Sequence, residues 1–280
     1  MDTRFLITVL SVADSGSFAA SARQLNLTPA AVVQRVRAIE SQLGVTLFAR
    51  RGQRVSPTAA CIALLPGLRR VVDVVDSLIS DLDPTGLSAP VRLGAIATAL
   101  TDNIPGVLVR FAGRAPNAQL TIIPGTSREL FRQVNDGQID AAFLVRPEID
   151  LPKSLDCVVL EQQPFVLITQ KDDVRTREQI LTESPALIYD TASWGGKIAL
   201  PWLKKNVPQD RILCELDALE TIVAAVTKGL GYAVIPNWKG MPGTGNIQKI
   251  ALPDIAKTRD LVLLHRKLGP ELVQLLVDQT

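Results

Sequence analysis

The chain has 280 residues, of which 47% are hydrophobic and 21% are charged, and its formal net charge at pH 7 is +2. This length accommodates two ordinary domains with buried cores, and this composition excludes an intrinsically disordered chain. No stretch reaches the roughly eighteen unbroken apolar residues that cross a bilayer. The first segment, MDTRFLITVL, lacks the small-residue cleavage site of a signal peptide, so we expect it to belong to the folded protein.

The positive charge is concentrated near the N-terminus. Residues 1–60 contain seven arginines against three acids, whereas residues 61–90 contain two bases against four acids. Residues 91–280 contain equal numbers of bases and acids, and the first lysine is Lys153. The planar guanidinium of arginine suits phosphate oxygens and guanine edges. The distribution fits a phosphate-binding N-terminal unit, although charge alone leaves a solvated basic face as the alternative.

Three short helices are predicted at the start of the chain. The apolar spacing over residues 3–14 indicates a first helix, and a second over residues 18–25 has Ser17 as its N-cap. After a tight turn, Thr28 caps a third helix with Pro29 at its first position. Two short helices, a brief turn and a third helix form the arrangement that places one helix in the major groove of DNA.

The third helix has two different faces. Its inward stripe is Val32, Val36, Ile39 and Leu43. On the opposite face, Gln34 can hydrogen-bond bidentately to adenine, and Ala30 or Val33 can contact a thymine methyl. Thr28 and Arg37 are expected at backbone phosphates, which set the register without reading the sequence.

A basic turn follows the third helix. The segment Arg50-Arg51-Gly52-Gln53-Arg54 comes directly after the apolar Leu47 and Phe48. Such a turn is typical of a wing that contacts phosphates, and a solvated arginine turn is the alternative in isolation. The three predicted helices before it favour the DNA-binding interpretation. The expected DNA-binding residues are Ser17, Thr28, Pro29, Ala30, Val33, Gln34, Arg37, Arg50, Arg51 and Arg54.

This region also resembles a known family. The segment GSFAASARQLNLTPAAVVQRVRAIESQLGVTLFARRGQRVSPTAA is similar to the N-terminal signature of LysR-type transcriptional regulators. The resemblance implies a winged helix-turn-helix over residues 1–60. The chain departs from the family at Val33, where serine is usual, and at Gln34, where arginine is usual. It also departs at Pro57, usually leucine, and at Cys61, usually glycine. The first two departures concern contacts to individual bases.

Residues 61–89 are expected to form a linker helix and a hinge. Apolar residues recur at heptad spacing in two series, Cys61, Leu68, Val75, Leu82 and Leu64, Val71, Leu78. The resemblance implies a homodimer paired through this helix, and packing on its own domain is the alternative. Pro66 should bend the helix or delay its start. The segment Asp83-Pro84-Thr85-Gly86 should end it and form the hinge.

Strands alternate with helices after Pro90, which predicts α/β layers. The predicted extended segments are VRLGAI, QLTIIPG, IDAAFLV, CVVLEQQPFVLITQ, ALIYD, LCELD, GYAVIP and DLVLLHR, with helices over 99–114, 127–136, 197–205 and 218–228. Ligands in such sheets bind at the carboxyl ends of strands, against helix N-termini. Four such ends are Ala97-Thr98, Gly125-Thr126-Ser127, Val145-Arg146 and the segment 190–193.

The segments RLGAIAT, FAGRAPNAQLTIIPGTSRELFRQVNDGQIDAAF and AAVTKGLGYAVIP resemble the effector domain of the same family. The resemblance implies two subdomains of periplasmic-binding-protein type with a ligand cleft between them. Subdomain I would comprise about 90–162 plus 267–280, and subdomain II about 163–266. Thr98 and Thr126 fall where family members hold an effector carboxylate, and Arg146 would supply positive charge. The expected effector-binding residues are Thr98, Thr126, Ser127, Arg146, Thr191 and Ser193, whose hydroxyls can also act as helix caps.

The sequence contains no catalytic or metal-binding constellation. Cys61, Cys157 and Cys214 lie far apart without a CxxC pair, and His265 is the single histidine, which excludes a disulfide framework, a zinc site and haem attachment. The segment Gly229-Leu230-Gly231 lacks the third glycine of a dinucleotide-binding loop. We expect no cofactor and no enzymatic activity, a structural His265, inert buried thiols at Cys157 and Cys214, and a cytoplasmic location.

The expected fold class is α+β multidomain, with an N-terminal winged helix-turn-helix, a linker helix and a C-terminal α/β effector domain over residues 90–280. The expected function is sequence-specific transcriptional regulation in which a small anionic effector modulates promoter binding. Expected partners are duplex promoter DNA, the effector, further copies of the chain as a homodimer or homotetramer, and RNA polymerase, without a membrane. The alternatives are a solute-binding protein, which predicts a signal sequence and no basic head, and a catalytic α/β protein, which predicts substrate turnover.

Overall fold

The chain divides into two units, Met1–Ala89 with Asp136–Gln138 and Pro90–Asn135 with Ile139–Thr280. The computed structural model describes residues 2–51, 54–80, 90–116, 118–266 and 268–277. The side chains of residues 50, 51, 54, 73, 76–80 and 270 lie outside this description. Among the helices that it describes, none is long and apolar enough to cross a membrane.

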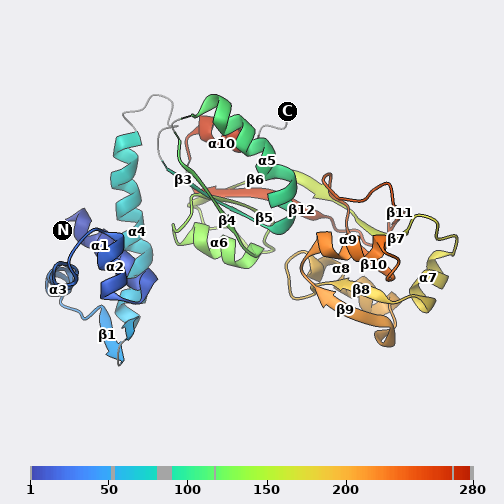
Figure 1. Ribbon diagram of the computed structural model, residues 1–280, viewed down its shortest axis with the longest axis horizontal. Helices are drawn as coiled ribbons and strands as arrows, with labels where there is room; N and C mark the ends of the chain where they lie inside the picture. Colours follow the sequence, from blue (N-terminus) through green and yellow to red (C-terminus); the bar gives the residue numbers. More distant parts are fainter. Residues whose placement is uncertain (1, 52–53, 81–89, 117, 267, 278–280) are drawn as a thin grey trace. The chain divides into compact units, whose positions relative to one another are not determined.

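Three helices begin the first unit, as the apolar spacing predicts (Figure 1). They are α1 (Thr3–Ser15), α2 (Phe18–Gln24) and α3 (Pro29–Leu43). The Ser17 hydroxyl accepts a hydrogen bond from the backbone N–H of Ala20 at 3.3 Å, and the Thr28 hydroxyl accepts one from Ala31 at 3.2 Å. Both predicted N-caps therefore satisfy amide groups that a helix start leaves without partners.

The turns around these helices use left-handed backbone conformations. Gly16 and Gly44, with φ angles of 62° and 69°, follow α1 and α3, and glycine adopts this conformation without steric cost. Asn26, at φ 52°, makes the tight turn expected between α2 and α3. The three helices enclose an apolar core that includes the whole predicted inward stripe of α3, with Val32, Val36 and Ile39 buried and Leu43 partly buried.

A two-stranded hairpin follows α3. It consists of β1 (Phe48–Arg51) and β2 (Arg54–Pro57), which pair antiparallel. The Glu40 carboxylate accepts hydrogen bonds from the backbone N–H groups of Leu47 at 2.7 Å and Phe48 at 3.3 Å. Because this carboxylate is on α3, it fixes the start of the hairpin to the helix that precedes it.

The linker helix α4 (Ala59–Ser80) begins before Pro66 and continues through it, so the start of the helix is not delayed. Cys61 and Leu68, which the heptad spacing assigned to a pairing stripe, are buried in the core of their own unit. Val71 and Val75 are exposed, at 48% and 36%. The stripe thus divides into a half that packs on α1–α3 and an exposed half. The expected heptad position Leu82 and the hinge at 83–86 lie outside the described residues.

The first of two five-stranded sheets in the second unit has the order β4-β3-β5-β12-β6. Its strands are β3 (Val91–Ala95), β4 (Leu120–Pro124), β5 (Ala141–Val145), β6 (Leu155–Gln163) and β12 (Arg259–Arg266). β3 is parallel to β4 and β5, whereas β12 is antiparallel to β5 and β6. α5 (Ala97–Arg114) and α10 (Pro270–Val277) lie on one side of the sheet and α6 (Ser127–Asn135) on the other (Figure 1). This sheet and its helices are subdomain I.

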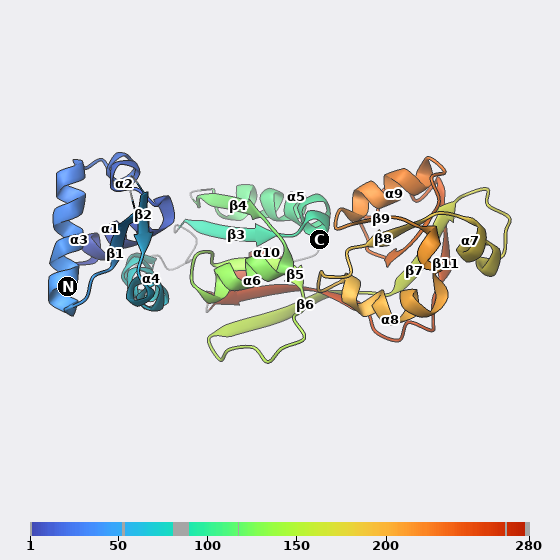
Figure 2. The same cartoon turned by 90° about the horizontal axis from the view of Figure 1, so that it is seen from below.

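Subdomain II is built on the second sheet, whose order is β11-β7-β10-β8-β9 (Figure 2). Its strands are β7 (Phe165–Gln170), β8 (Ala186–Tyr189), β9 (Ile212–Leu216), β10 (Tyr232–Pro236) and β11 (Ile247–Ala251). Its helices are α7 (Arg177–Glu183), α8 (Gly196–Asn206), the 3₁₀ turn η1 (Gln209–Arg211) and α9 (Leu219–Thr227). Alternate residues of β7 face two separate cores, one shared with α7 and α8 and one with α9.

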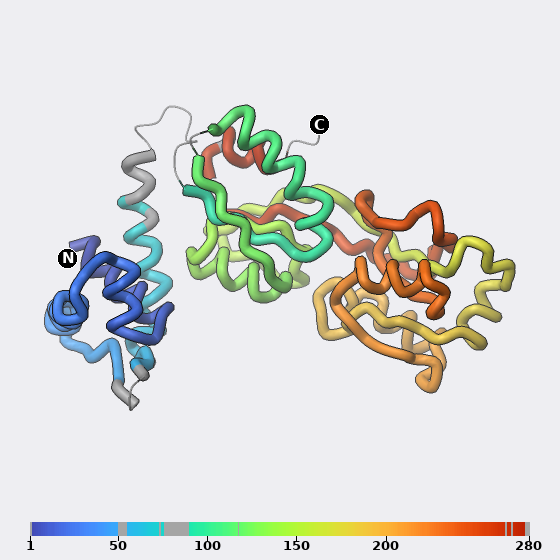
Figure 3. The backbone as a smooth tube through the Cα atoms, viewed as in Figure 1, coloured from blue at the N-terminus to red at the C-terminus, as the bar shows by residue number. Residues whose placement is uncertain are grey.

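Two segments connect the subdomains, and they can be followed along the tube in Figure 3. β6 ends at Gln163 and β7 begins at Phe165, while the return segment leads from β11 into β12. The expected boundary placed residues up to 266 in subdomain II. This was wrong, because Arg259–Arg266 pairs with β5 and β6 and therefore belongs to subdomain I. The composition of this apolar strand is compatible with either sheet, so only its hydrogen-bonded pairing shows to which subdomain it belongs.

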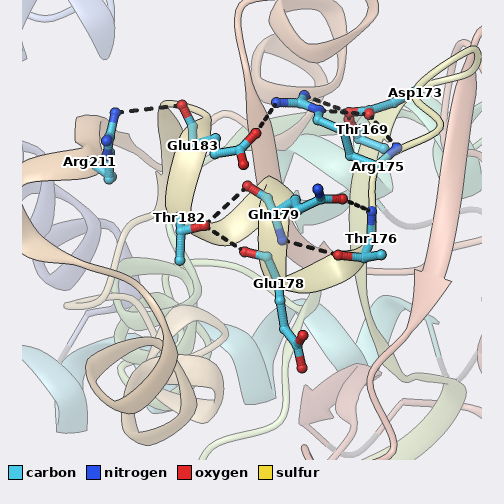
Figure 4. Close-up of polar contacts among 9 residues, drawn as sticks. All are labelled: Thr169, Asp173, Arg175, Thr176, Glu178, Gln179, Thr182, Glu183 and Arg211. Atoms are coloured by element: carbon cyan, nitrogen blue, oxygen red, sulfur yellow. Dashed lines mark hydrogen bonds and ion pairs between the residues drawn. The ribbon is translucent and has the colours of Figure 1, made fainter.

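Four elements were not predicted from the sequence, namely α7, η1, β11 and α10, and α5 begins at Ala97, before the expected residue 99. α7 has a capping box, in which the Thr176 hydroxyl accepts from Gln179 N at 3.3 Å and the Gln179 side chain accepts from Thr176 N at 2.9 Å (Figure 4). This Thr-x-x-Gln pattern is visible in the sequence and is the signal that could have located the helix.

A polar cluster holds the loop before α7 (Figure 4). The Asp173 carboxylate accepts hydrogen bonds from Arg175 Nε at 2.9 Å and Nη2 at 2.8 Å, and from the Thr169 hydroxyl at 2.7 Å. The Asp173 side chain is only 7% exposed. The Arg175 guanidinium therefore holds the pKa of Asp173 well below its usual range, with the Thr169 hydroxyl adding to the effect.

Candidate functional site

The exposed face of α3 carries the polar residues that the sequence assigned to DNA. Gln34 and Arg37 are exposed, and Val33 beside them is partly exposed. These side chains line a groove together with residues of α2 and the start of α3. The groove is lined by Phe18, Ala19, Pro29, Ala30, Val33, Gln34 and Arg37. Five of the ten predicted DNA-binding residues thus lie on one continuous surface.

The hydroxyls of Ser17 and Thr28 lie at the starts of α2 and α3. Their oxygens act as N-caps, and neither hydroxyl hydrogen has an acceptor among the described residues. Each hydroxyl is thus a helix cap and also a donor available to a phosphate, so the two roles are compatible. The side chains of Arg50, Arg51 and Arg54 lie outside the described residues, although their backbones form the predicted wing hairpin.

The three acids of residues 1–60 are engaged in internal contacts. Asp14 pairs with Arg69 of α4 at 2.6 Å, Asp2 pairs with Arg4 at 2.7 Å, and Glu40 binds the backbone of the hairpin. Arg37 has no ion-pair partner within the part of the chain that the structure describes, and neither does Arg23. The surface around α3 therefore presents cations without neighbouring anions, which is the electrostatic requirement for binding a phosphate backbone.

The hydroxyls predicted to bind an effector are mostly committed to other partners. Thr126 donates to the Glu129 carboxylate at 2.8 Å and caps α6, and its bonds with Glu129 lower the pKa of that carboxyl. The Ser127 hydroxyl accepts from Val145 N at 3.1 Å and is buried. In subdomain II, Thr191 donates to Glu215 at 2.6 Å. The Ser193 hydroxyl donates to the carbonyl oxygen of residue 190 at 2.7 Å.

Arg146 does not meet the other predicted effector residues in a shared pocket. It is exposed, and it lines a surface pocket that consists of residues 146–151 alone. None of the predicted hydroxyls lines that pocket.

Arg259 is the charged residue that sequence reasoning missed. It begins β12, is 1% exposed, and donates from Nη2 to the hydroxyl of Thr98 at 3.2 Å. Its Nε donates to the side-chain oxygen of Gln163 at 2.6 Å. An ideal Cβ on Gly195, in the loop before α8, would stand 2.9 Å from Arg259 Cδ and 2.6 Å from the Tyr189 hydroxyl. Elements of both subdomains therefore surround this guanidinium. The only signal in the sequence was an arginine preceding an apolar strand.

Hydrogen bonds between described residues join the two subdomains around this site. Thr101 on α5 donates to Glu220 on α9 at 3.3 Å. The backbone N–H of Gly240 donates to Asp102 at 3.2 Å. The backbone N–H of residue 239 donates to the carboxylate of residue 161 at 3.0 Å. These contacts place the first turns of α5 and α9 against one another at the junction.

Two acids follow the ends of neighbouring strands at the same junction. Asp190 comes after β8 and Asp217 after β9, and these parallel strands pair Tyr189 with Leu216 in register. Partial desolvation of its carboxyl group raises the pKa of Asp217, although the residue as a whole is exposed. The charge of Asp190 raises this pKa further, Arg259 opposes the shift, and Glu220 has a smaller raising influence. The junction thus holds a buried cation on the subdomain I side and a group of carboxylates on the subdomain II side.

The remaining chemistry-bearing residues have structural environments. His265 is buried, and its Nδ1 lies 2.6 Å from the carbonyl oxygen of Arg266. Burial raises the pKa of Cys61 to about 11 and also raises the pKa of Cys157. Cys214 is exposed on β9, contrary to the expected burial. No described group of three His, Cys, Asp or Glu side chains is arranged to hold a metal ion.

Two family models match the chain. Residues 3–61 match the model described as bacterial regulatory helix-turn-helix protein, lysR family, and residues 84–280 match the LysR substrate binding domain. Among similar curated proteins, the transcriptional regulator CzcR of Bacillus cereus is 28% identical over 271 residues, which covers 95% of this chain and 92% of that protein. The transcriptional activator IlvY of Salmonella typhimurium is 26% identical over 244 residues, covering 84% of this chain and 82% of IlvY.

Solved structures show the same fold. A full-length, cysteine-substituted OxyR from Pseudomonas aeruginosa matches with a TM-score of 0.77 at 20% identity, covering 99% of this chain and 94% of that one. LysG from Corynebacterium glutamicum with bound effector Arg gives a TM-score of 0.65 at 22% identity, with coverage of 99% and 97%. CbnR complexed with its target DNA gives 0.60 at 18% identity, with coverage of 99% and 98%. The expected fold class, helix-turn-helix followed by a two-subdomain effector domain, is confirmed.

Proposed function

The chain belongs to the LysR family of DNA-binding transcriptional regulators with an effector-binding domain, and from this premise we propose that a small molecule with an anionic group modulates its binding to a specific promoter sequence. The family consists of regulators and not of enzymes, as expected for this chain. The observation that carries the proposal is the exposed face of α3, where Gln34 and Arg37 line one groove while the three acids of residues 1–60 are engaged in internal contacts.

The proposed contacts follow from the geometry of this face. Gln34 reads an adenine edge in the major groove, and Ala30 or Val33 contacts a thymine methyl. Ser17, Thr28 and Arg37 bind phosphates, and Pro29 starts the helix against the backbone of the DNA. Arg50, Arg51 and Arg54 bind phosphates from the wing. The structure of CbnR complexed with its target DNA supports this general arrangement, because the two chains share a fold over nearly their whole lengths.

The proposed effector site lies where the subdomains meet. Thr98, at the start of α5, is the central residue of this site, because the Thr98 hydroxyl accepts a hydrogen bond from the buried Arg259. Thr126, Ser127, Thr191 and Ser193 support the site by fixing helix starts and strand ends around it. Arg146 remains proposed as an outer cation that attracts an anion. The structure of LysG with bound effector Arg supports a small-molecule ligand in a domain of this fold.

Assembly and location complete the proposal. We infer that two chains pair through the exposed half of α4, that pairs of dimers form a tetramer, and that the assembled regulator contacts RNA polymerase in the cytoplasm. The exposed Val71 and Val75 support pairing, since an apolar stripe on a helix favours a partner helix. A ligand shifts such an assembly only through its different affinity for the two arrangements.

The deciding experiment is binding of the purified chain to duplex DNA from upstream of its own gene, by footprinting and by titration with salt. We expect a palindromic footprint and a steep fall of affinity with salt, because neutralised phosphates release counterions. Gln34→Ala should lower specific affinity by about 1–3 kcal/mol, roughly 5- to 150-fold, and Arg50→Ala should weaken binding to all sequences.

The matched control is Gln42→Ala, which removes the same side chain from the last turn of α3. This variant should bind as the unchanged protein does. Binding to the upstream DNA that is no tighter than binding to random DNA, from low to physiological salt, would contradict the proposed function. The solute-binding alternative would then be preferred, and it predicts ligand binding without any DNA affinity.

A further inference from the structure

Arg259 is a buried cation without an ion-pair partner among the described residues. It is 1% exposed, and its two hydrogen-bond partners, Gln163 and Thr98, are neutral side chains. A guanidinium has five N–H donors. Two of them are used here, and the others have no acceptor among the described residues. Burying a charge without an ion-pair partner in contact is strongly unfavourable, so a site of this kind is incomplete as it stands.

The surroundings of Arg259 make it a recognition site for a carboxylate. Thr98 is the second residue of α5, and this helix has no side-chain cap at its start. The first-turn N–H groups of an uncapped helix favour an anion, and the guanidinium beside them offers a planar pair of donors. The Gln163 amide, itself 1% exposed, donates to Glu161 at 2.6 Å, which directs its oxygen towards Arg259 and fixes the guanidinium.

A simple anion does not suit the whole junction, because carboxylates gather on its other side. Asp190 and Asp217 follow strand ends that pair in register, and Glu220 lies in the first turn of the helix that comes next. The Asp217 carboxyl interacts electrostatically with the negative charges of Asp190 and Glu220 and with the positive charge of Arg259. A ligand bound here therefore meets a cation at one end and anions at the other.

We propose that this chain recognises a small zwitterion of the amino-acid type, whose carboxylate binds Arg259 and Thr98 and whose ammonium group faces Asp217 and Asp190. This inference rests on the proposed function, since it names the effector class of the same domain. Arg259 is the specificity-determining residue, and Gln163 is its positioning residue. Gly195 leaves room beside the Arg259 stem and the Tyr189 hydroxyl, where a side chain would collide with both.

Access to Arg259 requires the subdomains to separate. The guanidinium is buried while Thr101 and Glu220, and Gly240 and Asp102, are hydrogen-bonded across the junction. These are single contacts between exposed groups, which open at little cost. The carboxylate of the bound ligand would then supply the counter-charge that Arg259 lacks. The resulting ion pair would stabilise the closed arrangement of the subdomains.

The test is ligand binding to the purified full chain, by thermal unfolding and titration calorimetry without DNA. The probes are the twenty protein amino acids with ornithine, 4-aminobutyrate and diaminopimelate. For each binder, the N-acetylated acid and the decarboxylated amine are matched probes. We expect stabilisation by at least one zwitterion and a loss of affinity of at least about tenfold when either charged group is removed. No stabilisation by any probe overturns the proposal, and equal binding of an N-acetylated acid overturns the role of the acids.

Two variants test the residues. Arg259→Gln should abolish the ligand response, with affinity falling at least about thirtyfold. It should also raise the unfolding temperature of the ligand-free chain, because an unpaired buried charge is removed. A purely structural Arg259 predicts the reverse, a lower unfolding temperature. Asp217→Asn, at an exposed position, should fold normally and lose about tenfold in affinity for the zwitterion while gaining affinity for the N-acetylated acid.

Arg132→Gln is the matched control, because it removes an exposed arginine from the last turn of α6. Its ligand affinity should equal that of the unchanged chain. If Arg259→Gln fails to fold, the affinities of Asp217→Asn for the zwitterion and for its N-acetylated form decide whether the proposal holds. Tight, salt-dependent binding of DNA by the same preparation, together with no response to any zwitterion, would reject this inference and leave the proposed function intact.

Discussion

The side chains of α3 fall into two groups, those that pack into the apolar core and those that face outward. The inward stripe is readable from helical spacing, and the outward Gln34 and Arg37 follow from the same count. Which of the outward residues touch bases cannot be deduced from one chain, because that depends on how the helix lies in the groove. Substitution of a phosphate-binding residue changes the salt dependence of DNA affinity, whereas substitution of a base-reading residue changes sequence specificity.

Arg37→Ala should weaken DNA binding by a similar factor on specific and random sequences. Its guanidinium is exposed and has no ion-pair partner among the described residues, so we assign it to a phosphate. The slope of log affinity against log salt should decrease by about one unit. Fluorescence anisotropy over a range of salt concentrations measures this slope. An unchanged slope with a loss confined to the specific site would show that Arg37 reads a base.

Asp173 gives a stability prediction that depends on pH. Arg175 lowers its pKa in the folded state, so the contribution to stability is complete above the unfolded pKa of roughly 3.9 and disappears as the pH falls below it. Asp173→Asn should cost about 1–2 kcal/mol near neutral pH, after allowance for the solvent-exposed Arg175. Urea unfolding between pH 3 and 7 should show the difference shrinking towards acid. The neighbouring Asp172→Asn, which is exposed, serves as the control.

Cys61 and Cys214 should differ in reactivity. The pKa of Cys61 is raised to about 11 by burial, so the reactive thiolate is scarce at pH 8, whereas Cys214 is exposed. Brief treatment with iodoacetamide at pH 8 should modify Cys214 and leave Cys61 unmodified until the chain unfolds. Mass spectrometry of the peptides provides the measurement. Modification of Cys61 in the folded chain at a comparable rate would show that the core around it opens readily.

The sequence predicted Thr98 as a site residue but not Arg259, and the reason is physical. Thr98 lies at a strand end followed by a helix, and both signals are local in the sequence. Arg259 meets Thr98 from 161 positions away, at the start of a strand that was itself assigned to the wrong subdomain. The sequence predicted Arg146 instead, because Arg146 also follows a strand. Burial is what distinguishes the two arginines, and burial of a charged residue is not encoded in periodicity.

At the scale of elements, strongly periodic helices and apolar strands were predictable, and their partners were not. The α3 and α9 helices have clear apolar faces, whereas α7 and α10 are short and were missed. The heptad series in α4 was read as one stripe. The structure divides it, because α1–α3 need a fourth helix to close their core and take Cys61 and Leu68 for this purpose.

The exposed half of α4 should therefore govern pairing of the chains. Val71→Glu combined with Val75→Glu places two charges on the exposed stripe, and we expect dissociation to monomers. DNA affinity should fall at least tenfold, because two linked heads bind with a local concentration that separate heads lack. Sedimentation velocity measures the assembly state. Arg70→Glu, at an exposed position on the same helix, is the control and should remain dimeric.

At the scale of the whole chain, the order of domains was predictable because composition changes at their borders. The arginine-rich start, the heptad segment and the alternating strands and helices each have a distinct pattern. The path of the chain between the two sheets was not predictable, since β12 returns to the first sheet after a long excursion. Arg259 lies at the junction because β12 returns to the first sheet. The wrong subdomain boundary and the missed arginine therefore have the same cause, the unpredicted pairing of β12.

The register of β6 and β12 has a consequence for how this molecule could have been assembled. Gln163 and Arg259 are paired directly across the two strands, so subdomain II is inserted between two antiparallel neighbours whose register shifts once, between Leu261 and Val262. Replacing residues 164–258 by an Asn-Gly turn should give a shortened effector domain that retains its five-stranded sheet, because a two-residue loop spans such a pair. Circular dichroism and cooperative unfolding of this excised form would test it. Cooperative unfolding of the shortened form would show that subdomain II can be removed as a unit at the border between Gln163 and Arg259, two hydrogen-bonded neighbours.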